Sequence, residues 1–184
     1  MEIKITTTTM LKILYLLSWI IFIGLCIEAG GFLTNTIYTL AVDSKLASHF
    51  WAKLDFSELY RFSSNDFVVI TVQICIISIL KALLFYCIVK VLHDKKLNLT
   101  QPFNTAIGKF ISNMAYITLF IGFFSMWSKN YINWVESKNV FIPNIELLKI
   151  GGADVWLFMG IVLLVIAQIF KKGIEIQEEN ELTI

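Results

Sequence analysis

Two ionisable side chains, Glu28 and Lys81, lie inside long apolar stretches of this sequence and are the first candidates for chemistry. An ionisable group in such a setting is costly and rarely faces lipid. Two amides, Asn113 and Gln168, occupy two further apolar stretches. Groups of this kind either hydrogen-bond to one another and specify helix packing, or bind a proton, a cation or a ligand. The sequence therefore predicts a polar seam between helices, with Glu28 as the candidate proton or cation site.

Whether Glu28 pairs with Lys81 depends on how far their helices extend. If both helices continue past their apolar cores, the two side chains lie at similar depth near the middle of the membrane. If the helices end at the core limits, Glu28 is displaced towards one surface and Lys81 towards the other. A third alternative is that the stem of Lys81 packs on apolar surface while its amine reaches the membrane edge.

The other residue types that support catalysis form no constellation that we can assign. The three cysteines, Cys26, Cys75 and Cys87, lie in apolar stretches without a CxxC pair, so we expect them to pack as small apolar side chains. The two histidines, His49 and His93, fall on opposite sides of the expected membrane and cannot share a metal ion. We therefore expect no enzymatic activity, no catalytic residues, no bound metal and no cofactor.

The elements that must position these side chains are four apolar stretches separated by polar loops. Each has about the length of a bilayer-spanning helix, roughly 17–25 residues. The composition agrees, with 57% hydrophobic residues and a mean hydropathy of +0.73. We predict an all-α, four-pass integral membrane bundle in a single domain, with antiparallel sequential neighbours. The predicted spans are 11–33, 67–92, 105–127 and 153–170.

The first stretch resembles a secretory signal because Lys4 and Lys12 precede its apolar core. Signal cleavage requires small neutral residues after such a core, and Glu28 stands there instead. We therefore expect an uncleaved first span.

The lysine distribution predicts the orientation of the chain. Lysines concentrate around the short loop after the second span, where Lys95 and Lys96 are flanked by Lys90 and Lys109. The positive-inside rule then places this loop and both termini in the cytoplasm. The two longer loops face outward. A net charge of +1 argues against direct binding of nucleic acid.

The first outward loop contains a segment, 46–62, in which apolar and charged residues alternate at helical spacing. This pattern predicts a short amphipathic helix. Two alternatives remain for its position: it lies on the membrane surface, or it covers the bundle as an ordered lid.

The segment after the last span, 171–184, forms an acidic tail. We expect Gly173 to end the helix just after Lys171 and Lys172. Anionic lipids would repel the carboxylates beyond Gly173. An acidic tail with apolar residues should therefore bind either the basic inner loop or a basic partner protein. The other alternative is a solvated, disordered tail. The predicted partner-binding residues are Glu175, Glu178, Glu179, Glu181, Leu182, Ile184, Lys95 and Lys96.

The residues of this tail, 178–184, directly after a terminal span and Lys-Lys-Gly, resemble the end of domain-of-unknown-function family 2975. Pro102 and Phe103 before the third span also resemble that family. Its members are small bacterial four-pass membrane proteins, often encoded beside a helix-turn-helix regulator of the Xre/Cro type. The resemblance implies a bacterial inner membrane as the location and a membrane partner for a transcription factor, and it supplies no catalytic residues.

Three hypotheses for function follow. The first is a non-enzymatic sensor or anchor that binds a small cytoplasmic DNA-binding regulator through its tail and inner loop. The second is a small transporter or resistance protein, with Glu28 as its coupling carboxylate and a homodimer enclosing the pathway. The third is a structural or immunity-type protein that occupies a target in the membrane.

Overall fold

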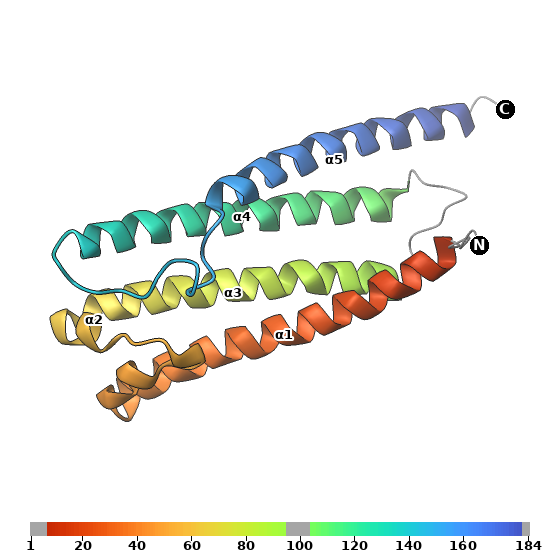
Figure 1. The fold of residues 1–184 in the computed structure, drawn as a ribbon. Coiled ribbons are helices and arrows are strands. Elements are labelled where there is room, and N and C mark those ends of the chain that lie inside the picture. Colours follow the sequence, from red (N-terminus) through yellow and green to blue (C-terminus); the bar gives the residue numbers. More distant parts are fainter. Residues whose placement is uncertain (1–6, 95–103, 182–184) are drawn as a thin grey trace, which may run out of the picture.

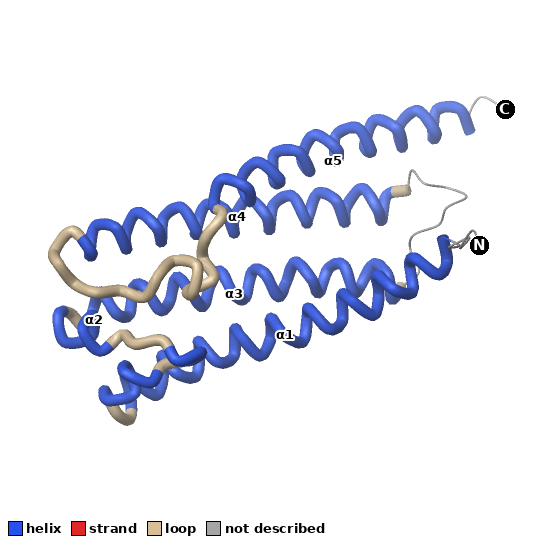
Figure 2. The backbone as a smooth tube through the Cα atoms, in the orientation of Figure 1, coloured by secondary structure: helices blue, strands red, loops and turns tan. Residues whose placement is uncertain are grey.

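The computed structural model describes residues 7–94 and 104–181, the side chains of residues 7, 8, 180 and 181 excepted; residues 1–6, 95–103 and 182–184 lie outside the description. The described chain is helical, and its only strand-like feature is an isolated bridge between Phe50 and Leu54 (Figure 2). The elements are α1 (Thr7–Ala41), η1 (Ser44–His49), η2 (Trp51–Lys53), α2 (Ser57–Phe62), α3 (Ser64–His93), α4 (Thr105–Glu136) and α5 (Ala153–Glu181). The predicted all-α architecture with four spanning helices is confirmed.

The four long helices lie in a row, in which each packs mainly on its neighbour in the chain (Figure 1). Neighbours run antiparallel, as the short connections predict. α1 begins and α5 ends at the same end of the molecule. Of the residues in the most apolar stretch of each helix, 56% are buried in α3, against 6% in α1 and 11% in α5. The outer helices of the row therefore present most of their apolar side chains to lipid.

The helices are longer than a membrane requires. α1 has 35 residues and α4 has 32. These correspond to about 50 Å at a rise of ~1.5 Å per residue, against a hydrocarbon core of ~30 Å. α5 begins beside the middle of α4, because Gly122 packs against Leu157 and Gly160 packs against Leu119. The last turns of α4 therefore extend beyond the start of α5. The first turns of α3 and the last turns of α1 extend beyond it as well (Figure 1).

These protruding helix ends are joined by the two longer loops into a structured cap, which we define as residues 42–66 and 127–152 (Figure 1). We call this the capped end and the opposite end, where α1 begins and α5 finishes, the terminal end. The apolar core of the molecule is concentrated at the capped end. Phe50, Phe56 and Phe67 form its aromatic centre, with ring centroids 5.1–6.0 Å apart and near-perpendicular planes.

The segment 46–62 forms part of this cap. Phe50, Leu54, Phe56 and Leu59 are each no more than 4% exposed, which supports the alternative of an ordered lid. The expectation of a single amphipathic helix is wrong, because the chain forms two 3₁₀ turns and the six-residue α2. Positive φ angles of 56° at Ala52 and 62° at the following lysine interrupt the helical path.

The expected helix break at Gly173 is also wrong, because α5 continues through this residue to Glu181. A glycine inside a helix costs about 1 kcal/mol relative to alanine. Contact with α4 offsets this cost: Ile174 lies against Gly108, where an added Cβ would be 3.4 Å from its Cδ1 atom. The acidic segment is therefore helical as far as the structure describes it.

Candidate functional site

The depth of Glu28 relative to Lys81 follows from the register of α1 against α3. Three contacting pairs define this register: Tyr15 with His93, Phe22 with Tyr86, and Thr36 with Cys75. Between the second and third pairs, Glu28 of α1 is level with Lys81 of α3. Both helices extend past their apolar cores, which is the condition under which the first alternative places the two side chains at similar depth.

Among the residues that the structure describes, no ion pair joins Glu28 to Lys81. The Lys81 ammonium group instead donates a hydrogen bond to the backbone carbonyl of Lys149, just before α5. It also lies 5.9 Å from the centroid of a Trp156 ring, within range of a cation–π interaction. Glu28 is half-buried and close enough to interact with the Lys81 charge through space. Lys81 thus connects α3 to the cap and to the first turn of α5.

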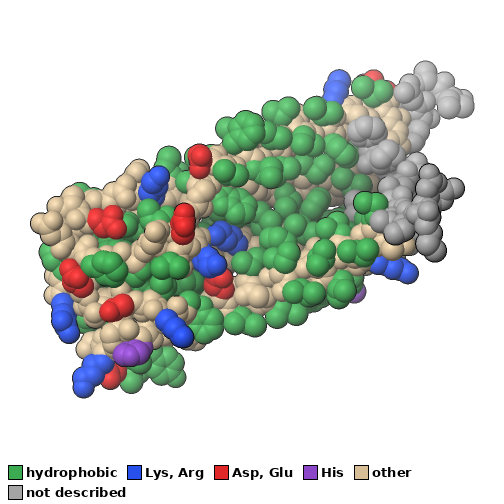
Figure 3. All heavy atoms as spheres, in the orientation of Figure 1, with side chains coloured by type: hydrophobic (Ala, Val, Ile, Leu, Met, Phe, Trp, Pro, Cys, Tyr) green, Lys and Arg blue, Asp and Glu red, His purple; other side chains and the backbone are tan. Residues whose placement is uncertain are grey.

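The surface changes character along the helices (Figure 3). Charged side chains gather over the capped end, and apolar side chains cover most of the rest of this face. The hydrogen bond from Lys81 to the carbonyl of Lys149 joins the middle of α3 to a residue of the cap.

The two predicted amides lie elsewhere. Asn113 and Gln168 line a pocket of about 350 Å³ between α4 and α5, near the terminal end, together with Lys109 and Lys171. The four predicted intramembrane polar residues therefore occupy two separate places and form no continuous seam: Glu28 and Lys81 near the cap, and the amides beside lysines at the other end.

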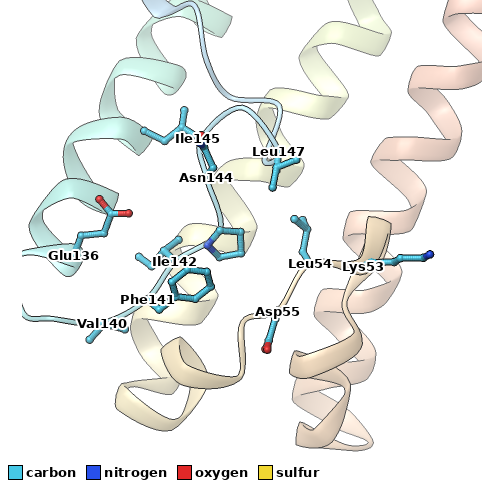
Figure 4. A pocket seen from close by; sticks show the side chains of 11 residues that line it. Lys53, Leu54, Asp55, Glu136, Val140, Phe141, Ile142, Asn144, Ile145 and Leu147 are labelled. Carbon is cyan, nitrogen blue, oxygen red and sulfur yellow. The ribbon is translucent and has the colours of Figure 1, made fainter.

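A cavity with a volume of about 730 Å³ lies in the cap (Figure 4). Its rim carries Lys53, Asp55 and Glu136. Its walls are mostly apolar, with Leu54 from the first loop facing Ile142 and other residues of the second loop. Apolar walls with a few charged groups are typical of small-molecule sites. Sequence reasoning missed this cap pocket, because its walls come from segments about 80 residues apart in the chain.

Hydrogen bonds and cation–π contacts add to the apolar packing of the cap. The Glu58 carboxylate accepts the backbone N–H of Phe141 at 3.0 Å, which joins the first loop to the second. The Tyr131 hydroxyl donates to Asp66 at 2.6 Å, which joins α4 to α3. Within the second half of the cap, the Lys138 ammonium group lies 3.4 Å from the centroid of a neighbouring tryptophan ring.

Asp55, on the rim of the cap pocket, is held in its charged form by Ser57. The side chain of Ser57 hydrogen-bonds to the Asp55 carboxylate, and its backbone N–H donates to the same group at 2.8 Å. These hydrogen bonds hold the pKa of Asp55 below its ordinary value of 3.8. The rim therefore carries a negative charge at neutral pH.

Sequence reasoning also missed several buried polar side chains, three of which lie on α3 and α4. Gln73 of α3 is 3% exposed, and Ser125 and Ser128 of α4 are at most 1% exposed. Their side-chain polar atoms form no hydrogen bond with the described residues. An unpaired buried polar group costs about 1–3 kcal/mol. Single polar residues within apolar stretches provide no signal of burial, so only the packing of α3 and α4 reveals these positions.

The helical extension of α5 places Glu175, Glu178 and Glu179 on one face, at spacings of three and four residues. All three are exposed. Glu175 forms a surface ion pair with Lys172, with the nitrogen and oxygen 3.3 Å apart. The other predicted partner-binding groups lie outside the described part of the structure. They are the side chain of Glu181 and the residues Leu182, Ile184, Lys95 and Lys96.

Four apolar helices of spanning length, with a structured cap at one end, define a polytopic membrane protein. The model of the family described as "Protein of unknown function (DUF2975)" matches residues 39–184, and the chain belongs to this family. The predicted family resemblance is therefore confirmed. Lys81, Asn113 and Gln168 lie inside the matched range, and Glu28 lies outside it. Comparison with curated proteins and with solved structures finds no match.

Proposed function

We propose that the protein is a membrane sensor without enzymatic activity, which binds a ligand in the cap pocket and holds a basic protein at the terminal end. The terminal end faces the cytoplasm in this proposal, as the lysine bias around the loop 93–104 predicts. The observation that carries the proposal is the continuity of α5. This single helix begins next to the second cap loop and ends in the exposed acidic face.

The connection between pocket and helix is short. The second cap loop lines the pocket through residues 140–145 and 147, and α5 starts at Ala153. Lys81 binds the intervening Lys149 carbonyl. Among the described residues, α5 packs mainly on α4 and is little buried. A ligand that repositions the loop would therefore move a helix held mainly by one neighbour, and this motion is the proposed signal.

The proposed output is electrostatic. Glu175, Glu178 and Glu179 form an acidic helical face that is complementary to a basic protein surface. The family resemblance implies a small DNA-binding regulator as that partner. An acidic helix bound to the DNA-facing surface of a regulator would exclude DNA, so membrane binding and DNA binding would be mutually exclusive.

Capture of proteins from cells in mild detergent tests this proposal. The full-length chain is compared with Glu175→Gln/Glu178→Gln and with Glu146→Gln/Asp154→Asn, which removes two carboxylates near the cap. We expect a small, basic DNA-binding protein to be captured by the wild type and the control but not by the tail variant. Equal capture by all three, or capture of no such protein by the wild type, would contradict the acidic-face proposal.

A second candidate function is transport with Glu28 as the coupling carboxylate. The observation that favours it is the shared depth of Glu28 and Lys81 between α1 and α3. Because the helices form an open row, a second copy would have to close the pathway. Glu28→Gln should abolish proton-coupled uptake in vesicles while leaving partner capture intact. Unchanged uptake in this variant excludes Glu28 from coupling.

A further inference from the structure

Three lysines of successive helices lie at one depth near the terminal end. The contact of Asp66 with Tyr131 defines the register of α3 against α4, and the contact of Leu119 with Gly160 defines that of α4 against α5. Followed towards the terminal end, these registers bring three basic side chains to the same level: Lys90, Lys109 and Lys171.

These lysines line two pockets that flank the first turns of α4. One pocket, of about 400 Å³, lies between α3 and α4 and includes Lys90. The other, of about 350 Å³, lies between α4 and α5 and includes Lys171. Lys109 and Asn113 line both pockets. The two cavities therefore share a cation and an amide donor, and each adds a second lysine.

The charges in these pockets favour an anion. Among the described residues, neither Lys109 nor Lys171 has an acidic partner, because Glu175 pairs with Lys172 instead. Both pockets also include Thr105, the first residue of α4. The N-terminus of a helix carries a partial positive charge, which adds to that of the lysines.

We propose that this paired pocket binds the phosphate group of an anionic phospholipid, with Lys109 at its centre. The position favours a lipid over free phosphate, since the lysines stand where the apolar parts of the helices end and lipid headgroups begin. Basic pockets between spanning helices are suited to such headgroups. Apolar side chains of the same walls, including Phe110 and Ile174, would lie along the first carbons of the acyl chains.

Native mass spectrometry of the full-length protein tests the proposal. The protein in detergent is offered phosphatidylglycerol and phosphatidylcholine with identical acyl chains, and bound lipids are counted. The test variant is Lys109→Gln/Lys171→Gln. The control Lys45→Gln/Lys129→Gln removes two exposed lysines of the capped half, and Lys109→Arg/Lys171→Arg keeps the charge at the site. Inorganic phosphate and glycerophosphate, each in excess, are added as competitors in separate arms.

We expect the wild type to prefer phosphatidylglycerol. This preference should fall about five-fold for each lysine removed from the site. The capped-half control and the arginine variant should keep most of the preference, which also shows that folding is intact. Equal binding of both lipids, or an equal loss in the capped-half control, would overturn the proposal. Displacement of the lipid by free phosphate would overturn the assignment to a lipid. None of these outcomes bears on partner capture, so the sensor proposal is tested separately.

Discussion

The side chain of Lys81 donates a hydrogen bond to the backbone carbonyl of Lys149 and so joins the middle of α3 to the segment that leads into α5. This contact spans 68 residues of sequence. It links the most buried helix of the row to the junction between the cap and α5. The account of α5 as a connection between the cap pocket and the acidic face depends on this junction being ordered.

Replacement of Lys81 by Met removes the charged donor and keeps most of the apolar stem. A hydrogen bond with a charged donor contributes ~1.5–3 kcal/mol when buried, so for a half-buried group we expect a loss of about 1 kcal/mol. Hydrogen exchange of the backbone amides in 146–153 should become faster. Lys129→Met, at an exposed position of α4, is the control and should leave this exchange unchanged. Slow exchange in both variants would show that the contact does not order the junction.

Substitution of Gly160 or Gly122 should separate α4 from α5. A Cβ atom at Gly160 would lie 2.6 Å from Leu119, and one at Gly122 would lie 2.7 Å from Leu157, with backbone atoms of both leucines also close. We expect each alanine variant to lose about 1–3 kcal/mol of stability through overpacking. The measurement is the unfolding midpoint in detergent. Gly24→Ala, where nothing lies within 4 Å, is the matched control and should be neutral or slightly stabilising.

The hydrogen bond from Phe141 to Glu58 should determine how the two cap loops close over the pocket. Glu58→Ala removes the acceptor, whereas Glu58→Gln keeps a carbonyl oxygen in its place. We expect faster hydrogen exchange at the Phe141 amide in the alanine variant, with a loss of about 1 kcal/mol in stability. The glutamine variant should behave like the wild type. Identical exchange in the two variants would mean that the loops are held by apolar packing alone.

The cap should lose stability in acid through Asp55. Because hydrogen bonds from Ser57 lower its pKa in the folded protein, the charged form stabilises the cap above the unfolded pKa near 3.8. This contribution is lost as the pH falls through the folded pKa. Ser57→Ala raises the folded pKa towards the unfolded one, so it should lower the thermal stability at neutral pH and reduce the further loss of stability in acid. The control Ser48→Ala removes a hydroxyl that hydrogen-bonds to Lys45 and His49. An equal loss of stability in acid for all three proteins would rule out Asp55 as the responsible group.

The sequence was sufficient to predict the four spanning helices, because apolar length is a local property. The depth match of Glu28 with Lys81 was one of the alternatives that the sequence left open, and it required both helices to extend past their apolar cores. The break expected at Gly173 was wrong for a tertiary reason, since Ile174 of α5 packs beside Gly108 of α4 and supports the helix beyond the glycine.

The cap pocket could not be predicted from local patterns. Leu54 and Ile142 face the same cavity only because the two loops pack against each other. Likewise, Lys109 and Lys171 were each assigned to a membrane edge, but the pocket between them depends on the register of α4 against α5. These features arise from contacts between segments distant in the chain.

The central claim is that the cap pocket and the acidic end of α5 are coupled, and a distance measurement tests it most directly. Spin labels at Ile176→Cys on α5 and Leu83→Cys on α3, in a chain whose native cysteines are replaced by serine or alanine, report the position of the helix end. Leu147→Trp adds bulk to the wall of the pocket, and Leu16→Trp adds the same bulk on the exposed face of α1. The account predicts a shifted distance distribution for Leu147→Trp alone. Identical distributions in all three proteins would contradict it.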